Sequence, residues 1–88
     1  MIRRRVVMHG LVQGVFFRDA VRRRALTAGV SGWVRNNWDG TVEVALEGEP
    51  EAVEKLIAFC REGPSGARVD QVEVVEAEVK SSKGFEIR

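Results

Sequence analysis

The chain has 88 residues, which suffices for one small domain but not for two, so we expect a single domain over residues 1–88. Its 14 basic and 13 acidic residues leave a net charge of +1, which offers no long-range field to attract nucleic acid or an anionic membrane. Cys60 is the only cysteine, so an internal disulfide is excluded, and no paired Cys or His spacing indicates a metal site.

The first elements are a strand and a helix joined by a glycine turn. An apolar, β-branched run predicts a strand at Val6–Val12. Gly14 lies in the turn that follows, and a helix begins at Phe17, because apolar residues recur from there at helical spacing. Gly29 is expected to end this helix in the left-handed conformation.

A hairpin is expected next. Ser31–Trp38 favours a second strand, and Asn37–Gly40 has the composition of a tight turn into a third strand at Thr41–Glu47. Apolar and polar residues alternate along this third strand. One face should therefore be buried, and the other, which carries Glu43 and Glu47, should be wet.

The remaining elements are a helix and two strands. Pro50 suits the first position of a helix, and Gly63–Gly66 ends it. Val69–Val79 alternates and then shifts phase at Val75, which predicts a strand with a bulge, and Phe85–Arg88 is a short last strand. The apolar stripe of the helix has the spacing i, i+3, i+4, i+7 and comprises Val53, Leu56, Ile57 and Cys60.

The element order is β-α-β-β-α-β with a short C-terminal strand, which predicts an α+β fold. Right-handed crossovers place both helices on one face of a mainly antiparallel sheet, giving a ferredoxin-like two-layer sandwich. RNA-recognition modules share this order, but they need stacked aromatic residues on two central strands. Val6–Val12 and Thr41–Glu47 contain none, which disfavours that alternative.

The run Gly10–Arg18 predicts an anion-binding turn between the first strand and the first helix. Backbone N–H groups can converge in such a turn, the helix N-terminus adds donors and partial positive charge, and an arginine supplies a planar fork for phosphate oxygens. The candidate binding residues are Gly14, Val15, Phe16, Phe17 and Arg18.

Two motifs make the chain resemble the acylphosphatase family. The run Gly10–Arg18 fits the signature GxVQGVxFR, and Gly32–Val42 fits the signature GWVxNxxxGxV, with Gly48 as the glycine expected after the third strand. The resemblance covers essentially the whole chain. Two departures lie outside the expected chemistry: Met8 replaces a branched aliphatic residue, and Leu11 replaces an arginine that is common there.

This resemblance implies hydrolysis of the carboxyl-phosphate anhydride of acyl phosphates, giving a carboxylate and inorganic phosphate without a metal or organic cofactor. It implies that Gly14–Phe17 and Arg18 hold the phosphate and that Asn36 positions the attacking water. The carboxylate of Arg88 is expected to approach Arg18. The partner is expected to be a small-molecule acyl phosphate, with no nucleic acid and no membrane.

The residue types in the chain are sufficient for the implied hydrolysis of an acyl phosphate. Phosphoryl transfer asks for charge stabilisation and alignment of the nucleophile, which arginine, backbone amides and an asparagine can supply. An acyl phosphate expels a weakly basic carboxylate, so no general acid is needed, and a phosphate monoester should be a poor substrate. The chain has one His and no Tyr.

A non-catalytic ligand-binding module is the main alternative, because this fold serves many functions. Such a module would need the anion-binding turn but no water-positioning Asn36. The other conspicuous residues have structural interpretations: His9, without an evident acidic partner, as packing or surface, Cys60 and Trp33 as core, and the runs Arg3–Arg5 and Arg22–Arg24 as solvated. With no disulfide, targeting segment or membrane span, we expect a cytoplasmic protein. We expect a monomer because one core takes up the apolar stripes of the domain.

Overall fold

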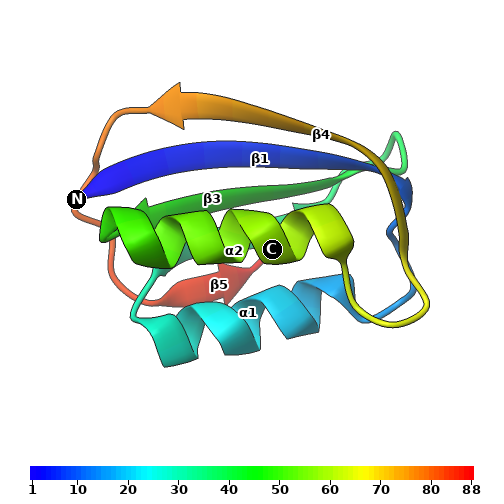
Figure 1. Cartoon of the computed structure of the whole chain (residues 1–88), viewed down its shortest axis with the longest axis horizontal. Coiled ribbons are helices and arrows are strands. Elements are labelled where there is room, and N and C mark those ends of the chain that lie inside the picture. The colour runs from blue at the N-terminus through cyan, green and yellow to red at the C-terminus, as the bar shows by residue number, and fades with distance from the viewer.

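In the computed structural model, which describes residues 1–88, two helices cover one face of a five-stranded sheet (Figure 1). The predicted α+β, ferredoxin-like sandwich is confirmed. Neither helix is both long and apolar enough to cross a membrane. In chain order the elements are β1 (Ile2–Leu11), α1 (Phe17–Ala28), β2 (Ser31–Asn36), β3 (Val42–Gly48), α2 (Pro50–Glu62), β4 (Arg68–Ala77) and β5 (Phe85–Ile87).

The sheet has the strand order β4-β1-β3-β2-β5. Both β1 and β2 are antiparallel to β3, so they run in the same direction, and β5 is parallel to β2. Val42 at the start of β3 pairs with Met8 of β1 on one side and with Asn36 of β2 on the other. The segments that follow β1, β2 and β5 therefore leave the sheet at the same edge.

The core lies between the sheet and the helices. Helix α1 buries Phe17, Val21 and Ala25 and ends at Gly29, whose φ of 72° is left-handed as predicted. Burial raises the pKa of the Cys60 thiol to about 12. The predicted stripe of α2, which comprises Val53, Leu56, Ile57 and Cys60, is buried against the core.

The prediction that β3 has a wet face is wrong. Glu43 is 6% exposed and Glu47 is fully buried, and the other two residues of that face, Thr41 and Ala45, are buried as well. Long side chains of the neighbouring strands cover this helix-free face, because β3 is the central strand. Arg3 Nη1 lies 3.1 Å from Glu47 Oε1, and Arg5 and Arg35 both pair with Glu43.

Two further expectations for this face are corrected. The run Arg3–Arg5 is not simply solvated: it belongs to β1, which begins at Ile2 rather than Val6, and Arg3 is only 5% exposed. Trp33 is half-buried on the helix-free face instead of lying in the core. The guanidinium groups of the three arginines around its indole lie 4.9–5.7 Å from the ring centroid; these are Arg5, Arg35 and Arg88.

Strand β4 also differs from its prediction. The register irregularity lies where His9 pairs with Gln71 and Gly10 with Val69, whereas Val75 pairs regularly with Arg5. The apparent phase shift at Val75 arises because β4 is an edge strand with largely exposed side chains on both faces. Alternation of residue types therefore does not report burial there. Strand β2 ends at Asn36, two residues earlier than predicted.

Candidate active site

A pocket of about 270 Å³ opens at the sheet edge where β1, β2 and β5 end. It brings Arg18, near the start of α1, together with Asn36, the last residue of β2, although 18 positions separate them in the chain. The residues that line it are Val12, Gly14, Phe16, Phe17, Arg18, Asp19, Asn36 and Ile87.

The loop between β1 and α1 supplies the backbone of this pocket. Gly14 has φ 75° and Phe16 has φ 61°, so two residues of the loop adopt the left-handed conformation. No side chain caps the N-terminus of α1. The backbone hydrogen bonds outside the regular elements include none donated by Gly14–Phe16. These amides and the uncapped helix end therefore provide free donors and partial positive charge at the pocket.

The five predicted phosphate-binding residues differ in their placement. Gly14, Phe16, Phe17 and Arg18 line the pocket, whereas the side chain of Val15 packs against the core. Phe17 belongs to both the pocket and the core. It lines the pocket, and its buried ring packs in the core beside the ring of Phe59.

Arg18 and Asn36 are both half-buried, and neither side chain is engaged by another residue through an ion pair or hydrogen bond. The expected approach of the Arg88 carboxylate to Arg18 gains no support, because no ion pair joins them. Instead the Arg88 amide donates to the carbonyl of Val34 at 2.8 Å, and its guanidinium pairs with Glu86.

Gly32 of the second motif has a structural role. It has φ 142°, and a Cβ atom there would lie 1.8 Å from the carbonyl oxygen of Ala45. Only glycine allows β2 and β3 to approach this closely. Because Asn36 ends the same strand, this close approach also fixes where Asn36 leaves the sheet.

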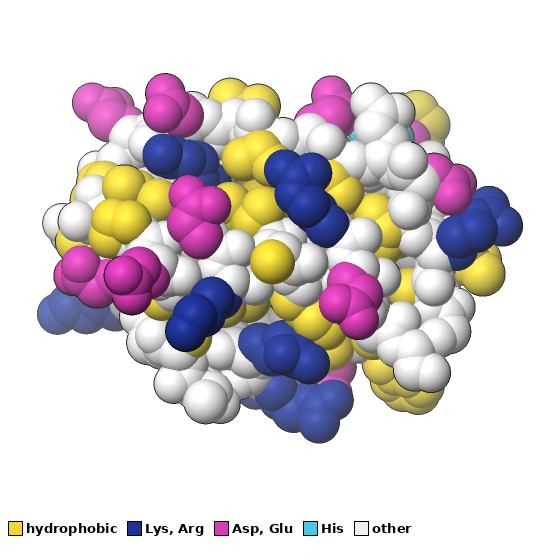
Figure 2. All heavy atoms as spheres, in the orientation of Figure 1, with side chains coloured by type: hydrophobic (Ala, Val, Ile, Leu, Met, Phe, Trp, Pro, Cys, Tyr) yellow, Lys and Arg dark blue, Asp and Glu magenta, His cyan; other side chains and the backbone are white.

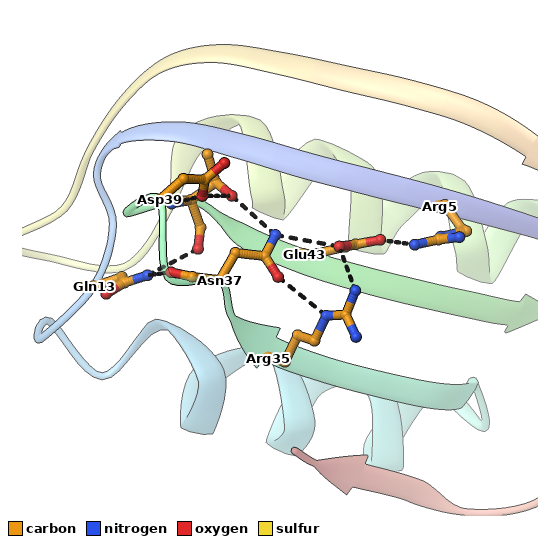
Figure 3. Close-up of polar contacts among 7 residues, drawn as sticks. Arg5, Gln13, Arg35, Asn37, Asp39 and Glu43 are labelled. Carbon is orange, nitrogen blue, oxygen red and sulfur yellow. Dashed lines mark hydrogen bonds and ion pairs between the residues drawn. The ribbon is translucent and has the colours of Figure 1, made fainter.

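The turn after Asn36 is held by a network of side chains (Figure 3). Arg35 Nε donates to Asn37 Oδ1 at 3.1 Å and Arg35 Nη2 donates to Glu43 Oε1 at 3.0 Å. Asn37 Nδ2 donates to Thr41 Oγ1 at 3.0 Å and to Glu43 Oε1 at 3.2 Å. The Thr41 hydroxyl and, to a lesser extent, its amide donate to Asp39 and lower the pKa of that carboxyl.

Four residues of this region were not among the predicted site residues: Val12, Gln13, Asp19 and Ile87. Ile87 of β5 and Asp19 of α1 line the pocket, and Asp19 pairs with Arg23 at 3.3 Å. Gln13 donates two hydrogen bonds to the hairpin turn and lies inside the first motif, which was the available signal. Ile87 alternates with the buried Phe85, but only the parallel pairing of β5 with β2 brings it to the site.

The remaining polar groups lie elsewhere. His9 has the acidic partner that the sequence did not reveal, since its Nε2 lies 2.5 Å from Glu73 Oε2 on the surface. No three His, Cys, Asp or Glu side chains converge to form a metal site. A larger groove of about 590 Å³ between α1 and α2 is lined by Arg23, Arg24 and Lys55 but contains no glycine turn. Figure 2 shows basic and acidic side chains interspersed on the helical face.

The chain is similar to acylphosphatases in both sequence and structure. The acylphosphatase family model matches residues 4–87. An acylphosphatase of Rubrobacter xylanophilus is 55% identical over 96% of this chain and 77% of its own length. The crystal structure of an acylphosphatase from Bacillus subtilis has a TM-score of 0.96 and 31% identity, covering 100% of this chain and 99% of its own. An acylphosphatase structure from Coxiella burnetii has a TM-score of 0.94 and 37% identity, covering 99% and 92%.

Proposed function

This chain belongs to the acylphosphatase family, hydrolysing acyl phosphates to a carboxylate and inorganic phosphate, and we propose that the pocket between Arg18 and Asn36 is its catalytic site. The main support for this proposal is that Arg18 and Asn36 line the same pocket, beside the uncapped N-terminus of α1. The site thus combines a guanidinium group, free amide donors and a neutral carboxamide.

In the proposed mechanism the phosphoryl group is held by the backbone amides of Gly14–Phe17 and by the guanidinium of Arg18. Charge in a loose phosphoryl-transfer transition state is spread over the phosphoryl oxygens. Donors that are already in place stabilise it without reorganisation during the reaction. Arginine suits this position because its planar fork can donate two parallel hydrogen bonds to a tetrahedral anion.

Asn36 orients the water that attacks phosphorus. The oxygen of water forms a bond to phosphorus, and the bond between phosphorus and the carboxylate oxygen breaks. The carboxylate leaves with the electron pair of that bond, and a proton of the water passes to a phosphoryl oxygen. Because the leaving carboxylate is weakly basic, no general acid is required. The mechanism therefore uses no titrating side chain of the pocket.

We also propose that the chain acts as one domain and as a cytoplasmic monomer, on small-molecule acyl phosphates and without a metal ion or organic cofactor. The apolar faces of both helices are already covered by the sheet, which supports the monomer. The amides and Arg18 supply the charge stabilisation for which other phosphoryl-transfer enzymes use metal ions.

Kinetics with benzoyl phosphate test the assigned roles. Asn36→Ala should abolish most turnover and leave competitive inhibition by inorganic phosphate nearly unchanged, because it removes only the water-positioning group. Arg18→Lys should lower kcat/KM on the order of a hundredfold or more, since two charge-assisted hydrogen bonds contribute about 1.5–3 kcal/mol each.

Arg61→Lys, on the exposed side of α2, is the matched control and should keep the wild-type rate. A phosphate monoester should be turned over poorly by every variant. Near-normal hydrolysis of benzoyl phosphate by Arg18→Lys or by Asn36→Ala would contradict the assignment.

A further inference from the structure

Gln13 joins the two halves of the candidate site. Its side-chain Nε2 donates to the carbonyl oxygen of Asn37 at 2.6 Å and to the carbonyl oxygen of Thr41 at 2.9 Å. Figure 3 shows the carboxamide reaching from the β1–α1 loop to the turn between β2 and β3. Both amide protons are therefore used across the gap between the two segments.

No other side chain connects these segments by a hydrogen bond. The backbone pairing of β1 with β3 ends at Met8 and Val42, and beyond it β1 pairs with β4 alone. Among the remaining backbone and side-chain hydrogen bonds, those of Gln13 are the ones that link residues 12–16 to residues 36–41. The Gln13 side chain is thus the one hydrogen-bonded link between the loop and the turn.

Each half is held internally without Gln13. The carbonyl of Asn37 also accepts from the Gly40 amide at 3.1 Å, and the carbonyl of Thr41 also accepts from the Asn37 amide at 2.8 Å. The contacts among Arg35, Asn37 and Glu43 fix the turn from the helix-free face. Loss of the Gln13 side chain would leave neither carbonyl without a partner.

From this geometry we infer that Gln13 is a positioning residue, which sets the distance between the loop that binds phosphate and the asparagine that directs water. This inference rests on the proposed roles of Arg18 and Asn36. Arg18 belongs to the same loop and helix start as the amides, and Asn36 immediately precedes the carbonyl that Gln13 holds. Gln13 itself does not line the pocket.

A positioning role predicts a specific kinetic signature. Gln13→Ala leaves the phosphate-binding loop intact, so KM for benzoyl phosphate and the inhibition constant of inorganic phosphate should stay within about threefold of wild type. The aligned attack of water should suffer, because a misplacement of about 1 Å can cost on the order of a hundredfold in rate. We therefore expect kcat to fall by about 10- to 100-fold.

Gln13→Glu provides a second readout, which a purely structural role would not produce. A carboxylate of the same length has no donor and faces two carbonyl oxygens, so at neutral pH this variant should be at least as slow as Gln13→Ala. Facing only acceptors raises the pKa of this carboxyl above its ordinary value. Its protonated form regains one O–H donor, so kcat relative to wild type should rise as the pH is lowered, whereas that of Gln13→Ala should not.

Gln71→Ala is the matched control, because Gln71 is the other glutamine, lies exposed on β4 and should leave kcat unchanged. The inference is overturned if Gln13→Ala keeps wild-type kcat, or if phosphate affinity falls as much as kcat does. It is also overturned if the two Gln13 variants share one pH profile. If the Gln13 variants turn over benzoyl phosphate at the wild-type rate while the Arg18 and Asn36 variants are impaired, only this inference fails. If the Arg18 and Asn36 variants are also unimpaired, the proposed site itself fails.

Discussion

Phe16 shows how the loop combines an unfavourable backbone with an exposed side chain. It has φ 61° and ψ 25°, a left-handed conformation that costs an L-residue with a Cβ about 1–2 kcal/mol. The residue is 81% exposed, so packing does not offset this cost. The conformation directs the chain from the glycine turn into α1, which places the first helical amides at the pocket.

Replacement of Phe16 by glycine should stabilise the protein. Glycine adopts the left-handed region without a Cβ clash, and its greater entropy in the unfolded state offsets part of that gain. We expect the free energy of unfolding to rise by about 0.5–1 kcal/mol, measured by urea denaturation. Phe16→Ala, which keeps the Cβ, is the control and should show no such gain; a glycine variant less stable than the alanine variant would contradict this reading.

At the level of elements, Glu47 ties β3 to two other parts of the chain. Arg3 of β1 donates to Glu47 Oε1 at 3.1 Å, and the backbone amides of Lys80 and Ser82 donate to its carboxylate at 2.7 and 2.8 Å. The backbone amide of Lys80, followed by the amide of Ser82 and the guanidinium of Arg3, holds the pKa of Glu47 below its ordinary value, although burial acts in the opposite direction. The carboxylate thus anchors the connection between β4 and β5.

This carboxylate makes stability depend on pH. Because the pKa of Glu47 is lower in the folded than in the unfolded state, its contribution is complete above about pH 4.5 and is lost as the pH falls through the folded value. Glu47→Gln, which leaves Arg3 without a charged partner, should cost about 3–5 kcal/mol at pH 7. Urea denaturation from pH 7 to pH 3 should show the difference from wild type shrinking below pH 4.5, and a constant difference would refute the assignment.

The same strand shows which elements can be predicted from sequence. Both helices were predictable because their apolar stripes and terminal residues are local signals, such as Pro50 at the start of α2 and Gly29 at the end of α1. The burial of Glu43 and Glu47 was not, because it depends on the central position of β3 and on arginines from β1 and β2. Charged residues in a buried strand are explained only by partners distant in the chain.

At the scale of the whole molecule, the strand order creates the site. The segments carrying Arg18 and Asn36 meet because β1 and β2 run in the same direction on either side of β3. The motifs predicted which residues gather there, since each motif is continuous in sequence. The contacts of Gln13 with Asn37 and Thr41, and the presence of Ile87, could not be predicted, because they arise from the register between distant strands.

Titration of ¹⁵N-labelled protein with inorganic phosphate, followed by NMR, is the sharpest test of whether the β1–α1 loop and Arg18 bind phosphate opposite Asn36. The largest saturable chemical-shift changes should fall on the amides of Gly14–Arg18 and on the side-chain carboxamide of Asn36. Changes confined to the groove lined by Arg23, Arg24 and Lys55, with the loop amides unmoved, would contradict this mode of binding.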